Sequence, residues 1–239
     1  MDVYPIPMGF CTSYLVRDRG VVLVDAGQQG YGDAFRRRLA QVGIAPDELT
    51  LVFLTHGHWD HIGFLGELRG LSRAPVAINH REKPWVEQGL MPLPRPITVW
   101  GRLLESFIKT FVMPKQTFGP VPVDITLGDD RFPLEAYGVD GALFSTPGHS
   151  SGSMSLILRT GEAFVGDLAV NGLPQSLRPN TSVFAEEPHL IPQSWRIILR
   201  AGAKVVHPAH GRPFEASALQ RLLHEPYAAL ENRSGPTTR

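Results

Sequence analysis

The stretch THGHWDHIGF, residues 55–64, concentrates side chains that bind metal ions. Its four candidates are His56, His58, Asp60 and His61, so three of the chain's nine histidines lie in one short segment. Neutral imidazole and carboxylate are ligands for Zn, Fe or Mn. Residues two apart can point to the same side of an extended or looped chain but diverge on a helix, so His56 and His58 are expected at a strand end, facing one ion. The adjacent Asp60 and His61 cannot easily face the same point as His56 and His58, so they could serve a second ion close by.

Four side chains are too few for two ions, because each ion takes about four to six donors. Three further donors follow predicted strands: His149 in STPGHSSG, Asp167 in AFVGD and His210 in VVHPAHG. Each lies next to a glycine where a strand gives way to a loop, a position that commonly carries function. A structural zinc site is expected to use four closed ligands, commonly including cysteine. Seven nitrogen and oxygen donors therefore favour two open ions.

Short apolar runs bounded by Gly, Pro or Asp predict the strands that position these residues. Two strands joined by a turn at Arg17–Gly20 are expected within 12–27, and others at 49–56, 75–80, 141–149, 153–160, 162–167 and 203–211. Helices are expected at 33–43, 61–71 and 192–202, the last with proline in its first turn and glycine at its end. We predict one domain over residues 1–230 and a frayed tail over 231–239.

The order HxHxDH, a lone His, an Asp and a final His resembles the metallo-beta-lactamase superfamily. The supporting segments are VVLVDAG, LTHGHWDHIG, TPGHSSGS, FVGDLAV and HPAHG, which cover roughly residues 12–215. The resemblance implies a mixed α/β (α+β) fold, an αββα four-layer sandwich whose halves meet near residue 120. It also implies two divalent ions: one on His56, His58 and His149, one on Asp60, His61 and His210, with Asp167 between them. Zinc is the first expectation, with Fe or Mn open. Asp25 would orient ligands, although it could instead cap a turn with Gly27.

Two adjacent ions can activate a shared water as a hydroxide nucleophile and polarise a carbonyl or phosphoryl oxygen. Asp60 could orient the hydroxide or carry a proton to the leaving group, which makes it the predicted catalytic residue. Related true beta-lactamases usually carry cysteine or serine at the position of Asp167, and related homoserine lactonases carry tyrosine at that of Val170. We therefore expect a hydrolase of a small ester, thioester or lactone. A mononuclear iron persulfide dioxygenase, a phosphodiesterase of the same fold and a non-catalytic binding protein are the alternatives.

Residues 81–119 interrupt the alternation of strands and helices and predict a helical insert. Apolar residues recur there at the spacing of a helix over 97–111: Ile97, Trp100, Leu104, Phe107, Ile108 and Phe111. This helix could pack on the core, or form a lid or acyl-binding wall over the site; a dimer surface is also open. Basic residues are sparse on its polar side, which disfavours a membrane-surface helix.

The amino-acid composition limits which kinds of binding partner are expected. Lys+Arg and Asp+Glu are both 23 among 239 residues, so no basic field predicts a nucleic-acid partner. No apolar run is long enough for a membrane span, and the first residues lack the basic region of a signal peptide. The single cysteine, Cys11, suits a reducing compartment, so we expect a cytoplasmic enzyme with a small-molecule substrate and leave a homodimer open. His80, His189, His207 and His224 are expected outside the site, and Trp59 has no assigned role.

Overall fold

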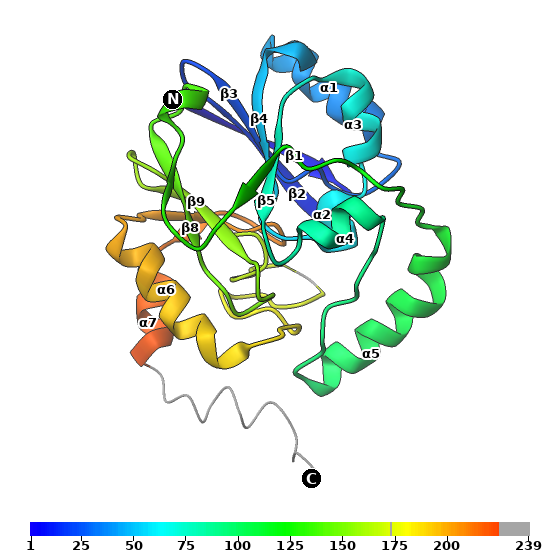
Figure 1. Cartoon of the computed structure of the whole chain (residues 1–239). Helices are drawn as coiled ribbons and strands as arrows, with labels where there is room; N and C mark the ends of the chain where they lie inside the picture. The colour runs from blue at the N-terminus through cyan, green and yellow to red at the C-terminus, as the bar shows by residue number, and fades with distance from the viewer. Residues whose placement is uncertain (173, 225–239) are drawn as a thin grey trace.

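Two six-stranded sheets face each other in the computed structural model, which describes residues 1–172 and 174–224 (Figure 1). The first sheet has, in order, β1 (Asp2–Met8), β2 (Cys11–Arg17), β3 (Val21–Val24), β4 (Leu49–Phe53), β5 (Val76–Asn79) and β6 (Ile125–Leu127). The second has β12 (Phe214–Glu215), β11 (Val205–His207), β10 (Glu162–Phe164), β9 (Met154–Leu158), β8 (Gly141–Ser145) and β7 (Phe132–Pro133).

Helices cover the outer face of each sheet, which confirms the predicted αββα sandwich (Figure 1). The helices are α1 (Gly32–Val42), α2 (Trp59–Ile62), α3 (Leu65–Leu71), α4 (Lys83–Gln88), α5 (Val99–Phe107), α6 (Ile191–Arg200) and α7 (Ser217–His224). Helices α1 and α3 lie on the first sheet, and α6 and α7 lie on the second. Helix α1 ends where Gly43 adopts a left-handed conformation (φ 65°), which glycine tolerates without steric cost.

Three apolar clusters match the three interfaces between the four layers. Phe35 of α1 and Leu68 of α3 pack with Leu23 of the first sheet. Between the sheets, strand residues of both halves meet, such as Phe53 and Phe164. Trp195 of α6 packs with residues of the second sheet. Because the central strands are buried on both faces, β3, β4 and β9 consist of short, nearly continuous apolar runs rather than alternating ones.

Parallel pairing brings the loops of the site to one edge. Strands β3 to β6 run parallel in the first sheet, as do β10 and β11 in the second. The carboxyl ends of parallel strands meet at the same edge of a sheet, where ligands commonly bind. The loops after β3, β4, β8, β10 and β11 carry the residues that the sequence singled out.

Some predicted boundaries were wrong. The helix expected at 61–71 is two helices, α2 and α3, and the first begins earlier, at Trp59. The chain passes from the first sheet to the second between Leu127 and Phe132, later than the expected position near residue 120. Strand β1 and the short strands β6, β7 and β12 were not predicted. The expected tail at 231–239 lies outside the described residues, and the limits of the single domain stay a prediction.

Residues 81–119 connect β5 to β6 and are largely helical. They contain α4 and α5, and then a π-helical turn at Ile108–Val112 that runs into a 3-10 turn at Met113–Lys115. In Figure 1, α5 stands at the side of the sandwich, away from the helices that cover the sheets. None of the helices in the described part of the chain has the length and apolar character that crossing a membrane requires.

Candidate metal centre

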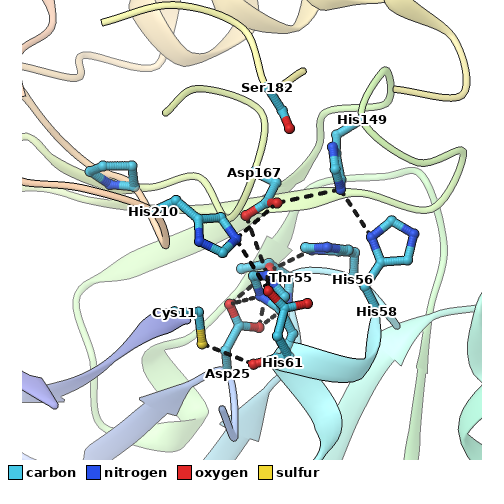
Figure 2. Close-up of polar contacts among 12 residues, drawn as sticks. Cys11, Asp25, Thr55, His56, His58, His61, His149, Asp167, Ser182 and His210 are labelled. Atoms are coloured by element: carbon cyan, nitrogen blue, oxygen red, sulfur yellow. Dashed lines mark hydrogen bonds and ion pairs between the residues drawn. The ribbon is translucent and has the colours of Figure 1, made fainter. Parts of the chain in front are cut away.

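All seven predicted donors converge at this edge of the sandwich. Figure 2 labels His56, His58, His61, His149, Asp167 and His210. They come from loops that follow β4, β8, β10 and β11, so residues more than 150 positions apart in the sequence become neighbours. Three groups have donor atoms that all lie within 4.8 Å of one another: His56, His58 and His149; His56, His61 and Asp167; and Asp60, His61 and His210. The first and third groups match the two sets expected from the sequence.

Asp167 lies between the two sets. Its Oδ1 is 3.3 Å from Nε2 of His61, and its Oδ2 is 3.1 Å from Nε2 of His210 and 3.6 Å from Nε2 of His149. Asp60 Oδ2 is 3.3 Å from Nε2 of His210. On the other side, Nδ1 of His58 is 3.0 Å from Nε2 of His149. One carboxylate therefore faces imidazoles of both sets, the position that a bridging ligand would need.

The spacing and the unsatisfied atoms both fit divalent cations. A tetrahedral ion with bonds of about 2.0 Å holds its donors about 3.3 Å apart, close to the separations above. Within the donor cluster, four buried atoms have no hydrogen-bond partner among the described residues: Nε2 of His56, His58 and His61, and Oδ1 of Asp167. A buried polar atom without a partner costs about 1–3 kcal/mol, so a site with several such atoms is expected to hold another species.

A further layer of contacts fixes the orientation of the imidazoles. Oδ2 of Asp25 lies 2.8 Å from Nδ1 of His61, and the same carboxylate accepts from the backbone N–H of Thr55 at 2.7 Å. The Phe184 carbonyl lies 2.9 Å from Nδ1 of His149, and the Phe10 carbonyl lies 2.8 Å from Nδ1 of His210. A partner on Nδ1 leaves Nε2 as the free donor atom, which is the usual arrangement around metal-binding histidines.

Asp25 therefore contacts the site rather than serving only as a turn cap. It is buried and adopts a positive φ of 60°, which among non-glycine residues favours Asp and Asn. This left-handed turn places its carboxylate within hydrogen-bond distance of His61 Nδ1 and Thr55 Oγ1. The strain is one more sign that the position serves the site.

Burial keeps three of the histidines neutral. It lowers the pKa of His56 well below its usual range, and nearby His61, His58 and His149 lower it further. Burial, followed by the neighbouring His149, lowers the pKa of His58 to about 3. It also lowers the pKa of His149, although Asp167 opposes the shift. Neutral imidazole is the form that binds metal, so this set needs no proton release.

In the second set, which contains Asp60, His61 and His210, the histidine pKa values shift in the opposite direction. Burial alone would lower the pKa of His61 and His210, but the facing carboxylates outweigh it. Asp25, Asp60 and Asp167 raise the pKa of His61, and Asp167 and Asp60 raise that of His210 to about 10. The same histidines lower the pKa of Asp167 well below its usual range against the effect of burial. The carboxylates thus attract positive charge to these atoms, and a divalent cation can take the place of the protons.

Glu82 is a buried carboxylate that the sequence analysis missed. It follows β5, is fully buried, and accepts hydrogen bonds from the backbone of Gly57, from Ser150 Oγ at 2.5 Å and from Gly152 N at 3.0 Å. It therefore ties the loop of His56 and His58 to the loop of His149. Burial raises its pKa to about 7 although these hydrogen bonds oppose the shift. Its position after a predicted strand was the only available signal.

The centre opens into a cavity of about 370 Å³. At its floor lie His58, Asp60, Asp167 and His210, and the rest of the lining is predominantly aromatic and aliphatic. Trp59, which had no assigned role, is buried and also lines this cavity, with its ring 5.7 Å from that of Phe10 in an edge-on arrangement. A mostly apolar pocket with a few convergent polar groups is the usual form of a small-molecule site.

The helix expected at 97–111 is a wall of the cavity. Trp100, Leu104, Phe107 and Ile108 all line it, and Trp100 and Phe107 remain 48% and 51% exposed. The alternative that this apolar face packs on the core is therefore wrong for these residues. Ile97 instead packs against the cluster of the second sheet, and Phe111 is exposed without lining the cavity.

The remaining histidines lie apart from the centre, as expected. His80 and His189 are exposed. His207 is the last residue of β11, and its ring stacks on Phe164 at 4.7 Å. Ser150 and Ser153 hydrogen-bond each other at 2.7 Å within the loop that carries His149.

Comparison with known proteins agrees with this geometry. The family described as the metallo-beta-lactamase superfamily matches residues 6–210 of the chain. The chain belongs to the metallo-beta-lactamase superfamily. Structures of the superfamily share its fold: a B3 metallo-beta-lactamase, BLEG-1, is 22% identical with a TM-score of 0.68, over 95% of this chain and 99% of that one. A family protein from Thermus thermophilus is 20% identical with a TM-score of 0.66, over 96% and 81%.

Several curated relatives in the superfamily are described as probable metallo-hydrolases. One from Streptococcus pyogenes is 27% identical over 161 residues, 64% of this chain and 59% of the relative. Another, YqgX from Bacillus subtilis, is 26% identical over 163 residues, 66% of this chain and 65% of the relative. The metallo-beta-lactamase domain-containing protein 1 of Rattus norvegicus is 54% identical over only 48 residues, 20% and 19% of the two chains. The chain thus spans less than two thirds of each of these relatives.

Proposed function

We propose that this protein is a dinuclear metal-dependent hydrolase acting on a small ester, thioester or lactone. The observation that carries the proposal is the cluster of seven nitrogen and oxygen donors, of which His58, Asp60, Asp167 and His210 line a mostly apolar cavity. His56, His58 and His149 would hold one divalent ion, zinc in the first instance. Asp60, His61 and His210 would hold the other, and Asp167 would contact both.

Ions bound in this way lower the pKa of water toward neutrality and polarise a carbonyl oxygen. The chain's own residues set the conditions for that chemistry. Asp25, Phe10 and Phe184 hold imidazole Nδ1 atoms, so that the other ring nitrogen is presented to the centre. The ionised Asp167 and Asp60 supply negative charge that balances the cations.

Asp60 is the residue we assign to proton transfer. Its carboxylate lines the cavity as well as facing His210, so it reaches both the donor cluster and a bound substrate. In the overall reaction, water oxygen adds to the carbonyl carbon, the bond from that carbon to oxygen or sulfur breaks, and the leaving group receives a proton. A carboxylate positioned beside the reacting atoms can accept the proton of water and pass it to the leaving group.

The test compares His58→Ala and Asp167→Ala with His80→Ala, a control that removes an exposed histidine outside the centre. Each purified protein is assayed for metal content and for hydrolysis of ester, thioester and lactone substrates. We expect the first two variants to lose metal and at least about a hundredfold of turnover, and the control to behave as wild type. Unchanged hydrolysis in both site variants would overturn the proposal. So would one iron per chain with oxygen consumption, the signature of a dioxygenase.

A further inference from the structure

Helix α5 presents one apolar face to the cavity. Trp100, Leu103, Leu104, Phe107 and Ile108 line it, and they recur at the spacing of three and four residues that defines one side of a helix. Such a face normally packs on the protein, but Leu103 and Phe107 are 61% and 51% exposed. An exposed apolar face next to a reaction centre marks a surface that a ligand covers.

Hydrogen bonds anchor the chain before and after the α5 face that lines the cavity. The Thr98 hydroxyl caps the helix by accepting from Gly101 N at 2.8 Å, and Ile97 N donates to the Val183 carbonyl at 3.0 Å. Beyond the helical turns that follow α5, the side chain of Gln29 exchanges two hydrogen bonds of 2.8 Å with Thr117. The segments before and after this apolar face are therefore attached to the rest of the fold.

The wall offers a substrate apolar area and little hydrogen bonding. The only side-chain N–H among its five residues is the Trp100 indole, which already donates to the Pro174 carbonyl at 2.8 Å. Phe10, Trp59 and Phe184 add aromatic surface to the lining. A chain lying against these side chains would gain stability from burial and not from specific polar contacts.

The charges of the lining residues do not suit an anionic substrate. Among the described residues that line it, none is Lys or Arg, and the ionisable groups are the carboxylates of Asp60 and Asp167 and the imidazoles of His58 and His210. A carboxylate or phosphate carried on the far end of a substrate would lose its hydration against apolar side chains with no counter-charge.

We propose that the cavity takes an uncharged substrate whose apolar acyl chain lies along the α5 face, with its carbonyl carbon at the donor cluster. Leu103 and its neighbours on this face then determine the preferred acyl length. The inference rests on the proposed hydrolase function and specifies its substrate class.

The test is a series of 4-nitrophenyl esters from acetate to octanoate, plus a hexanoate-length ester that ends in a carboxylate. Each buried methylene contributes about 0.8 kcal/mol, so kcat/KM is expected to rise about fourfold per methylene that enters the cavity. The carboxylate-ended ester is expected to lose at least about tenfold relative to its uncharged counterpart.

A matched pair of variants isolates the wall. Leu103→Glu places a carboxylate on the lining face, whereas Val99→Glu places one on the same helix at a residue that is 51% exposed and does not line the cavity. We expect the octanoate-to-acetate ratio of kcat/KM to fall on the order of tenfold in Leu103→Glu, the equivalent of about two methylenes, and to stay at the wild-type value in Val99→Glu.

The possible outcomes test the hydrolase function and the acyl-chain inference separately. If the metal-loaded protein hydrolyses no ester, thioester or lactone of any length, the proposed function fails. If short esters are hydrolysed but rates do not depend on acyl length, or the two Glu variants have the same ratio, the hydrolase stands and the acyl-wall inference is overturned. Equal rates for the charged and uncharged hexanoate-length esters would also overturn it.

Discussion

Replacing Asp25 by Asn tests whether the groups behind the ligands control the centre. The carboxylate is 2% exposed, with Oδ2 2.8 Å from Nδ1 of His61 and Oδ1 accepting from Thr55 N at 2.7 Å. Asparagine has nearly the same shape and tolerates the positive φ of 60° at this position. The substitution therefore changes hydrogen bonding and charge while leaving the backbone preference in place.

The expected effect follows from the proton on His61. An Asn oxygen can still accept from Thr55 N, which turns the amide NH2 toward Nδ1 of His61. That nitrogen must then accept, and the imidazole proton moves to Nε2, the atom that faces Asp60 and Asp167 at 3.9 and 3.3 Å. A protonated Nε2 cannot bind a cation, so the second set of ligands loses one donor.

Partners of metal-binding histidines typically account for about 10–100-fold in metal affinity, or about 1.4–2.7 kcal/mol. We expect a loss of this size for one zinc ion in Asp25→Asn, and a smaller change for the other, measured by competition with a chromophoric chelator. Asp33→Asn is the matched control, because that carboxylate is exposed, lies outside the centre and pairs with Arg36 at 3.0 Å. Wild-type affinity for both ions in Asp25→Asn would refute the assigned role of Asp25.

Three further predictions concern Glu82, the position of α5 and the apolar layer behind the second sheet. Because the pKa of Glu82 is raised to about 7 from an ordinary 4.5, its contribution to stability is fully present below about pH 4.5 and is lost as pH rises through 7. As pH rises from about 4.5 to 7, the unfolding free energy of wild type should therefore fall by about 3 kcal/mol relative to that of Glu82→Gln. The measurement is a denaturant titration at each pH in the presence of chelator. Parallel pH profiles of the two proteins would contradict this. A methyl group on Gly101 would lie 2.6 Å from the Val183 carbonyl oxygen, so Gly101→Ala should displace α5 and lower the octanoate-to-acetate rate ratio without changing metal content; an unchanged ratio would argue against a fixed wall. Trp195 is fully buried behind the second sheet and donates to the Leu168 carbonyl at 3.1 Å, so Trp195→Ala should cost about 3–5 kcal/mol of unfolding free energy, whereas a cost below about 1 kcal/mol would show that this layer is not core.

The donor set could be predicted from the sequence because each donor follows a recognisable strand. His149, Asp167 and His210 all come after short apolar runs and next to glycine. A fold whose strands end at one edge brings such residues together whatever their separation along the chain. The αββα arrangement could be expected from the motif order, through the family resemblance that it carries, whereas the alternating runs alone predicted only a domain of strands and helices.

Other features depend on packing that local sequence does not encode. Glu82 gained its role only because the start of α4 places it beneath two loops far apart in sequence. Strands such as β7 and β12 are two residues long, too short to show any periodicity. For residues 97–111 the helical period was visible, but the same spacing suits a face on the core and a face on a cavity. The direction of that face follows from its anchors at Val183 and Pro174.

The central claim is that seven donors hold two divalent ions, with Asp167 between them. Anomalous diffraction recorded at the zinc edge on crystals of the zinc-loaded protein tests it most directly. We expect two peaks per chain, one among His56, His58 and His149 and one among Asp60, His61 and His210, each in contact with Asp167. A single peak, or peaks away from these residues, would contradict the account.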